Sequence, residues 1–160
     1  MSAEVTSSKI SIVLIDDHQV FREGLRAVLV AQPDLNVVGE AGDGASAYAL
    51  VEANAPDVAL VDIALPGVHG IAVAREFKRR APRCRVLILT AGGMPDSVEE
   101  ASAAGVAGYA LKTQSAETIV DAIRVIARGE TYWPAELGER NGTGARSGSA
   151  SLETLSRRER

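Results

Sequence analysis

Basic charge, cysteine and long apolar runs are all scarce in this sequence, and each shortage excludes a class of protein. The 17 Lys and Arg are outnumbered by 21 Asp and Glu, so the net charge of −4 offers no broad basic surface for nucleic acid. The single cysteine, Cys84, rules out an internal disulfide framework and a multi-cysteine metal site, and it fits a reducing cytoplasm. The longest apolar runs, such as residues 12–15, are far too short to span a membrane, and the N-terminus has no signal-peptide core.

Aromatic residues are also few, at 4%, but the chain is 46% hydrophobic and 24% charged, which is typical of a globular protein. Its 160 residues suffice for one domain with a tail. The composition changes near Leu137, where apolar periodicity gives way to the Gly- and Ser-rich sequence GERNGTGARSGSAS at 138–151. We therefore expect one domain over residues 9–134 and a flexible linker over residues 135–154.

Within residues 9–134, short apolar runs alternate with amphipathic stretches of helical period. The fourth helix is expected to open on a capping box at 96–99, and the fifth to run from a Ser115 cap to a Gly129 stop. Five β–α units predict an α/β fold, a doubly wound five-stranded parallel sheet flanked by five helices. The runs are rich in Val, Ile and Leu, as in strands buried on both faces, and they occupy residues 10–15, 37–38, 58–61, 86–89 and 109–111.

Polar side chains follow four of the five expected strands. Asp16 and Asp17 follow the first strand, Asp62 the third, Thr90 the fourth and Lys112 the fifth. Each alone has an ordinary explanation as a cap, a turn residue or a solvated charge. Ligands of such folds bind at the carboxyl ends of the strands, however, and three carboxylates crowded at that edge need a cation. Mg²⁺ is the natural candidate, because it is a hard ion that prefers oxygen ligands.

Four stretches of the chain resemble the receiver domain of two-component response regulators. They are IVLIDDHQVFREGLRAVL at 12–29, PDVALVDIALPGVHG at 56–70, VLILTA at 86–91 and GYALK at 108–112. The wording DDHQVFREGL is closest to the NarL/FixJ branch, whose members carry a LuxR-type helix-turn-helix domain after the receiver. The resemblance covers about residues 9–134 and implies the flavodoxin-like receiver fold.

The resemblance also implies roles for the acidic residues. Asp62 matches the phosphoacceptor, which a partner histidine kinase phosphorylates in this family. Mg²⁺ in such receivers is bound by the positions that match Asp17, Asp62 and the backbone carbonyl of Ala64. Asp16, the other member of the acidic pair, matches the residue that holds a metal-bound water.

Three further residues match the parts of a receiver that respond to phosphorylation. Thr90 matches the switch hydroxyl, and Lys112 matches the lysine that contacts the phosphoryl group. Tyr109 matches the aromatic switch residue, which repacks into the space near Thr90. Dimerisation is expected through the face built from about residues 95–128, or through the first helix around residues 20–28.

The sequence predicts little chemistry at several other positions. We interpret His18 as a turn residue, His69 as a surface loop residue and the second strand end at 40–42 as chemically poor. Trp133 is expected at the far end of the fifth helix, away from the metal. The sequence alone does not fix how His69 or the Gly92-Gly93 pair affects switching.

The last residues, LSRRER at 155–160, resemble the opening of a LuxR-type DNA-binding domain that is truncated here. The leading hypothesis is therefore the receiver of a cytoplasmic, phosphorylation-controlled transcription regulator, which is not an enzyme and reaches DNA only through the absent domain. One alternative is a stand-alone receiver or phosphorelay protein that acts by protein contact. Another is a Mg²⁺-dependent phosphohydrolase, although Ala64 stands where such enzymes carry an acid–base aspartate.

Overall fold

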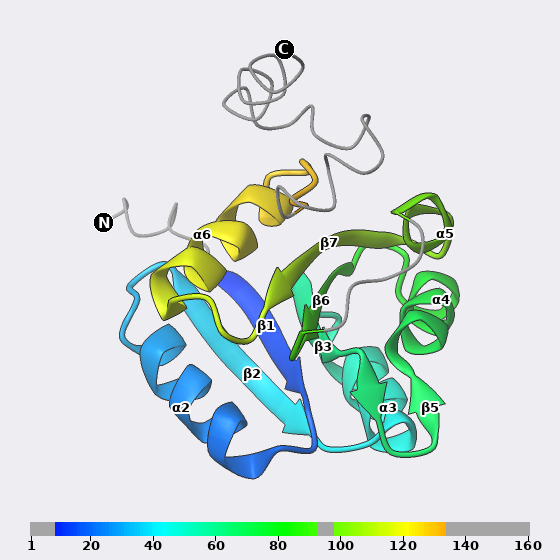
Figure 1. Ribbon diagram of the computed structural model, residues 1–160, viewed down its shortest axis with the longest axis horizontal. Helices are drawn as coiled ribbons and strands as arrows, with labels where there is room; N and C mark the ends of the chain where they lie inside the picture. Colours follow the sequence, from blue (N-terminus) through cyan, green and yellow to red (C-terminus); the bar gives the residue numbers. More distant parts are fainter. Residues whose placement is uncertain (1–8, 93–97, 134–160) are drawn as a thin grey trace.

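A five-stranded parallel sheet forms the centre of the computed structural model, which describes residues 9–92 and 98–133 (Figure 1). The strands lie in the order β2-β1-β3-β6-β7, and every neighbouring pair is parallel. This is the order of the flavodoxin-like doubly wound sheet, which confirms the expected fold. The strands are β1 (Ile10–Ile15), β2 (Leu35–Ala41), β3 (Val58–Asp62), β6 (Arg85–Thr90) and β7 (Val106–Leu111).

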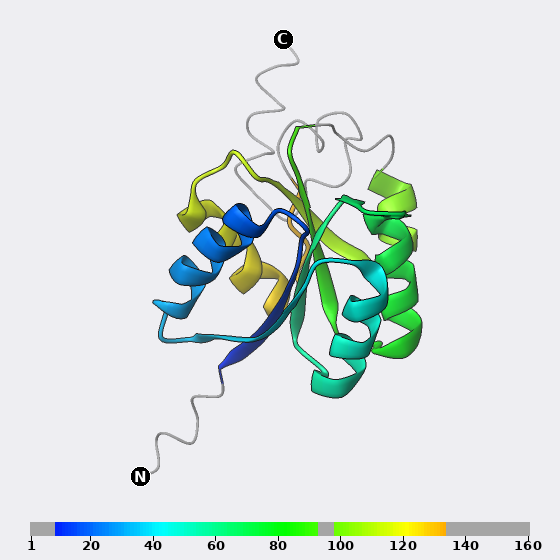
Figure 2. The ribbon, with the colours of Figure 1, turned by 90° about the horizontal axis from the view of Figure 1, so that it is seen from below.

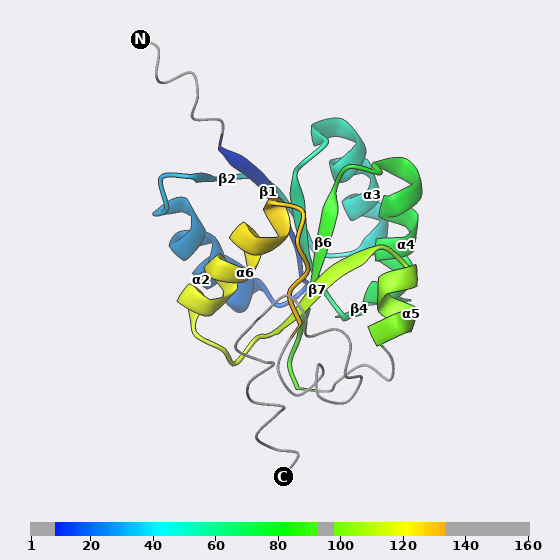
Figure 3. The same ribbon diagram turned by 90° about the horizontal axis from the view of Figure 1, so that it is seen from above.

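Five helices cover the sheet, α2 and α6 on one face and α3, α4 and α5 on the other (Figures 2 and 3). The side chain of Ser115 caps α6 by accepting a hydrogen bond from the Thr118 N–H, and Gly129 follows the helix with a φ of +97°, as predicted. The capping box expected at 96–99 begins outside the described residues. The helices are α2 (Gln19–Val30), α3 (Gly44–Asn54), α4 (Gly70–Arg80), α5 (Val98–Ala103) and α6 (Ala116–Ala127).

The hydrophobic core consists of two clusters, one on each face of the sheet. Leu60 of β3 belongs to the cluster under α2 and α6, together with Ile123. Its neighbour Val61 belongs to the opposite cluster, together with Phe77 of α4. Because helices cover both faces, every residue of β3 is buried, and this explains the unbroken apolar runs in the sequence.

Three features of the fold differ from the expectation. Strand β7 begins at Val106, before the run expected at 109–111, because Ala107 and Gly108 weaken the apolar signal there. Strand β2 has 7 residues, well beyond the two expected at 37–38, because an edge strand tolerates the polar Asn36 and Glu40. A short hairpin, β4 (Ala64–Leu65) and β5 (Val68–His69), was not expected, and Gly67 turns it with a φ of +74°. No helix within the described part of the chain is long and apolar enough to cross a membrane.

Candidate functional site

The site lies where the strand order of the sheet reverses, between the carboxyl ends of β1 and β3. Asp16 and Asp17 follow β1, and Asp62 is the last residue of β3. Asp16 and Asp62 are each only 3% exposed, whereas Asp17 is exposed. One oxygen from each carboxylate and a ring nitrogen of His18 all lie within 4.8 Å of one another. The fold thus brings the three predicted aspartates together.

Lys112 supplies the positive charge of this cluster. Its ammonium lies 2.7 Å from Asp16 Oδ2 and 3.3 Å from Asp62 Oδ2, and its side chain is 9% exposed. The Lys112 backbone N–H donates to the Thr90 carbonyl at 2.8 Å, which ties the residue to the end of β6. Two buried carboxylates therefore share one ammonium, and the low exposure strengthens that attraction.

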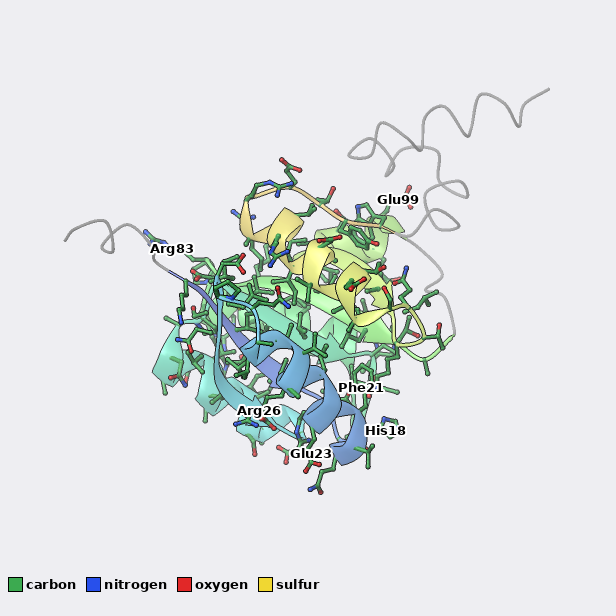
Figure 4. All side chains as sticks on the ribbon, turned by 90° about the vertical axis from the view of Figure 1, so that its left-hand side faces the viewer. His18, Phe21, Glu23, Arg26, Arg83 and Glu99 are labelled. Carbon is green, nitrogen blue, oxygen red and sulfur yellow. The ribbon has the colours of Figure 1, made fainter. Side chains whose placement is uncertain are left out.

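His18 takes part in the site, although we interpreted it only as a turn residue. Its Nδ1 lies 3.1 Å from the Lys112 ammonium and 3.5 Å from Asp16 Oδ1. The ring of Phe21 covers the same ammonium, with the Lys112 Nζ 4.7 Å from the ring centroid. Figure 4 shows His18 and Phe21 next to each other near the start of α2. The available signal in the sequence was the position of Phe21, only a few residues after the acidic pair.

The backbone around Asp62 is fixed from several directions. The Ala64 N–H donates to Asp62 Oδ1 at 3.2 Å, and the Ile63 N–H donates to the Leu89 carbonyl at 2.9 Å. Gly70 begins α4 against this segment, and a Cβ at Gly70 would lie 2.7 Å from the Asp62 carbonyl oxygen. Only glycine permits this approach, so the helix start holds the carboxylate-bearing strand end in place.

His69 is exposed, as expected, but it lies in β5 and also has a defined contact. It is the N-cap of α4, and its Nδ1 accepts a hydrogen bond from the Ile71 N–H at 3.1 Å. It also lines an open cleft of about 1000 Å³ that contains Asp62 and Lys112. The nearly buried Asp62 carboxylate therefore lies at the wall of an open cleft.

The two expected switch residues line the same cleft. Thr90 is 2% exposed, and its Oγ1 accepts from the Gly92 N–H at 3.4 Å. Tyr109 is fully buried, and its hydroxyl finds no hydrogen-bond partner among the described residues. Burial raises the pKa of the Tyr109 phenol, and the Glu100 carboxylate raises it further. A buried hydroxyl without a hydrogen bond costs free energy, which a ring position with a bonded hydroxyl would recover.

Trp133 lies against Tyr109, which the sequence did not suggest. The ring centroids are 5.8 Å apart, with an interplanar angle of 31°. The backbone of the preceding residue pairs with β7, because the Tyr109 N–H donates to the Tyr132 carbonyl at 2.9 Å and the Tyr132 N–H to the Ala107 carbonyl at 3.0 Å. Figure 3 shows this segment, in orange, returning beside β7. The last described residue of the chain therefore contacts Tyr109, the expected switch residue, directly.

The cluster offers the oxygen ligands that a hard divalent cation prefers. Its carboxylates come from Asp16, Asp17 and Asp62, and oxygen is the ligand atom that such ions prefer. Asp16 Oδ2 is buried and receives no aligned hydrogen bond within the described residues, although the Lys112 ammonium is close. A buried acceptor with this unused capacity fits a metal ion or a water bound to one.

Comparison with known proteins identifies the family. A family model described as the response regulator receiver domain matches residues 12–124. The chain belongs to the response regulator receiver family. Its relatives include the transcriptional regulatory protein DegU of Brevibacillus brevis, 39% identical over 132 residues, which cover 82% of this chain and 56% of DegU. LiaR of Bacillus subtilis is 40% identical over 121 residues, which cover 76% of this chain and 57% of LiaR.

Solved receiver structures agree with this assignment. The signal receiver domain of NarL from Mycobacterium tuberculosis superposes with a TM-score of 0.72 at 41% identity, covering 77% of this chain and 99% of that one. A LuxR-family response regulator from Aurantimonas gives a TM-score of 0.73 at 34% identity, covering 78% of this chain and 89% of that one. The receiver is thus of the NarL and LuxR type, as the sequence indicated, and its named relatives are transcription regulators and not enzymes. The chain spans less than three fifths of DegU and of LiaR.

Proposed function

We propose that this receiver takes up a phosphoryl group on Asp62 in a Mg²⁺-dependent reaction. One observation carries the proposal: the buried Asp62 carboxylate opens on the cleft, 3.3 Å from the Lys112 ammonium and beside two further carboxylates. Asp17, Asp62 and the Ala64 carbonyl would bind Mg²⁺ directly, and Asp16 would bind it through water. The bound ion would supply positive charge next to the phosphoryl oxygens.

The chain's own residues attack the donor and stabilise the transferred group. A carboxylate oxygen of Asp62 forms the new bond to phosphorus while the bond from phosphorus to the donor atom breaks, and the donor atom keeps the electron pair. That atom is an imidazole nitrogen when the donor is a phosphorylated sensor histidine kinase, and an acetate oxygen when it is acetyl phosphate. Lys112 offsets the charge that builds up on the phosphoryl oxygens. Thr90 then donates its hydroxyl to one of them.

Intact-mass measurement after incubation with acetyl phosphate and Mg²⁺ tests the proposal. The unmodified sequence should gain one phosphoryl group, and Asp62→Asn should gain none. Asp57→Asn is a matched control. Asp57 lies just before β3, at the end opposite Asp62, and accepts hydrogen bonds from Ser11 there. Full labelling of the Asp62→Asn protein would overturn the assignment.

We propose further that phosphorylation acts through Tyr109 and changes dimerisation. Movement of Thr90 toward the phosphoryl group opens space into which the Tyr109 ring can repack. Arg124, which lies in the face expected at residues 95–128, is bonded within the chain, because its Nε and Nη2 donate to the Asp34 carboxylate at 2.9 Å each. The contact would therefore not draw on Arg124. Light scattering with and without phosphorylation, with Tyr109→Ala as control, tests the coupling, and an unchanged mass in every case would contradict it.

The output function is also a proposal, because DegU and LiaR are considerably longer than this chain. We assign residues 9–134 to the receiver, 135–154 to a flexible linker and 155–160 to the opening of a LuxR-type helix-turn-helix domain; residues 134–160 lie outside the described part. The regulator is expected to be cytoplasmic and to bind DNA through that domain alone. Residues 1–160 should therefore give no sequence-selective gel shift, and nanomolar selective binding would refute this organisation.

A further inference from the structure

Arg22, in the first turns of α2, connects the carboxyl ends of β1 and β2. Its Nε donates to Glu40 Oε1 at 2.9 Å, and its Nη1 donates to the backbone carbonyl of Asp16. The side chain is 19% exposed, so the contact is largely shielded from water. The second strand end, which we interpreted as chemically poor, thus anchors an arginine that reaches the backbone of the acidic pair.

The carbonyl that Arg22 binds belongs to the peptide between Asp16 and Asp17. That peptide is planar, so the direction of its C=O sets the direction in which Asp17 leaves the strand. On the other side, the Asp16 N–H donates to the Ala41 carbonyl at 3.0 Å. The His18 N–H donates to Asp16 Oδ1 at 2.8 Å. Among the described residues, Arg22 is therefore the one side chain that donates a hydrogen bond to the Asp16 carbonyl.

The choice of a carbonyl as acceptor matters for metal binding. Lys112 pairs with carboxylate oxygens of Asp16 and Asp62, and so it competes with a cation for them. The recorded hydrogen bonds of Arg22 go to a carbonyl and to Glu40, which leaves the oxygens of the acidic pair available. The guanidinium can satisfy both acceptors at once because its donors form a planar fork.

We propose that Arg22 is a positioning residue for Mg²⁺ binding. Its hydrogen bond fixes the Asp16–Asp17 peptide so that the Asp17 carboxylate faces the cluster. This inference rests on the proposed function for the identity of the ion. Groups behind metal ligands commonly change metal affinity by about tenfold or more when they are removed. The competing explanation is that Arg22 and Glu40 form only an ordinary ion pair between α2 and β2.

Arg26 provides a matched control for that explanation. It lies one turn further along α2, and its Nε is 2.8 Å from Glu40 Oε2, the second oxygen of the same carboxylate. Figure 4 shows Arg26 on α2, apart from His18 near the start of that helix. Arg26 is 54% exposed, and none of its recorded contacts is with Asp16. Arg26→Gln therefore removes one charge and one ion pair with Glu40 but leaves the Asp16 carbonyl bonded.

Calorimetric titration with MgCl₂, on proteins whose thermal unfolding shows that they are folded, separates the two explanations. We expect Arg22→Gln to raise the Kd for Mg²⁺ by about tenfold and Arg26→Gln to leave it nearly unchanged. The sign is informative, because loss of a positive charge near a cation site should by Coulomb's law tighten binding. Equal or tighter Mg²⁺ binding by Arg22→Gln would overturn the positioning role.

A second variant keeps the charge and removes the fork. Arg22→Lys presents a single ammonium, which cannot serve Glu40 and the Asp16 carbonyl with the same geometry, so we expect weakened Mg²⁺ binding here as well. Wild-type affinity in Arg22→Lys would show that charge alone suffices and would overturn the proposal. Failure of the proposed function looks different: the unmodified protein would then bind no Mg²⁺, or would not be labelled at Asp62.

Discussion

Replacing Gly108 by alanine should detach the segment that follows α6 from the sheet. An added Cβ would lie 2.2 Å from the Tyr132 carbonyl oxygen and 3.1 Å from the Tyr132 Cβ. Because both close atoms belong to one residue at the sheet edge, that residue must move away. The Tyr109 N–H and the Tyr132 N–H then lose their backbone partners, and the contact between the Tyr109 and Trp133 rings is lost with them.

The magnitude follows from these three contacts. Each backbone hydrogen bond contributes about 0.5–1.5 kcal/mol net. The aromatic contact contributes roughly the same. Alanine in a strand recovers about 0.5–1 kcal/mol of backbone entropy relative to glycine. The net loss in the free energy of unfolding is therefore about 2 kcal/mol, which moves the urea midpoint down by roughly 1 M.

Urea unfolding followed by circular dichroism measures this loss, and the emission of Trp133, the single tryptophan, reports the detachment separately. Gly24→Ala is the control, because a Cβ at Gly24 meets nothing within 4 Å and alanine favours the helix interior. The control should be unchanged or slightly more stable. If Gly108→Ala keeps both the midpoint and the native Trp133 emission, the segment does not rest on β7 as described.

Three further outcomes follow from the structure. Asp17→Ala should weaken Mg²⁺ binding, measured by calorimetry, more than Asp16→Ala, and equal losses would argue against a direct and a water-mediated ligand. Burial raises the pKa of the Cys84 thiol to about 12, so Cys84 should react with a thiol reagent at pH 8 only after unfolding; rapid reaction of the folded protein would contradict this. The hydrogen bond from Arg124 lowers the pKa of Asp34. The ionised Asp34 therefore stabilises the folded protein above the unfolded pKa of 3.8, and this stabilisation is lost as pH falls through the lower folded pKa. Asp34→Asn should reduce the fall in thermal stability over that acidic range.

Much of the fold could be predicted from the sequence because parallel strands covered on both faces leave unbroken apolar runs. That signal located β1, β3 and β6 and the polar residues at their ends. It failed at β2, where an edge position admits Asn36 and Glu40, and at the two-residue strands of the β4–β5 hairpin, which are too short to show a period. Strand periodicity reports burial, and it weakens wherever burial is partial.

The part of the candidate site that could be predicted consists of residues at the carboxyl ends of strands. Asp16, Asp62 and Lys112 meet because parallel strands share one carboxyl edge. Phe21 and Arg22 reach the same edge from a helix, and helical periodicity assigns positions only to a core or a surface face. Trp133 was misplaced because the path of the chain after α6 depends on its pairing with β7, a contact between residues far apart in the sequence.

The formal charges at the strand ends account for the arrangement of the basic residues around them. Three aspartates and the Lys112 ammonium leave a formal charge of −2, which one divalent cation balances. A second basic group bound to the carboxylates would reduce that attraction, whereas a guanidinium bound to a carbonyl does not occupy a ligand oxygen.

Phosphorylation of Asp62 would replace one negative charge by about two. Lys112, now closer to Asp16 than to Asp62, would be drawn toward Asp62, and it follows β7, the strand to which Tyr132 is bonded. We therefore expect charge added at Asp62 to act first on β7, the strand that pairs with Tyr132.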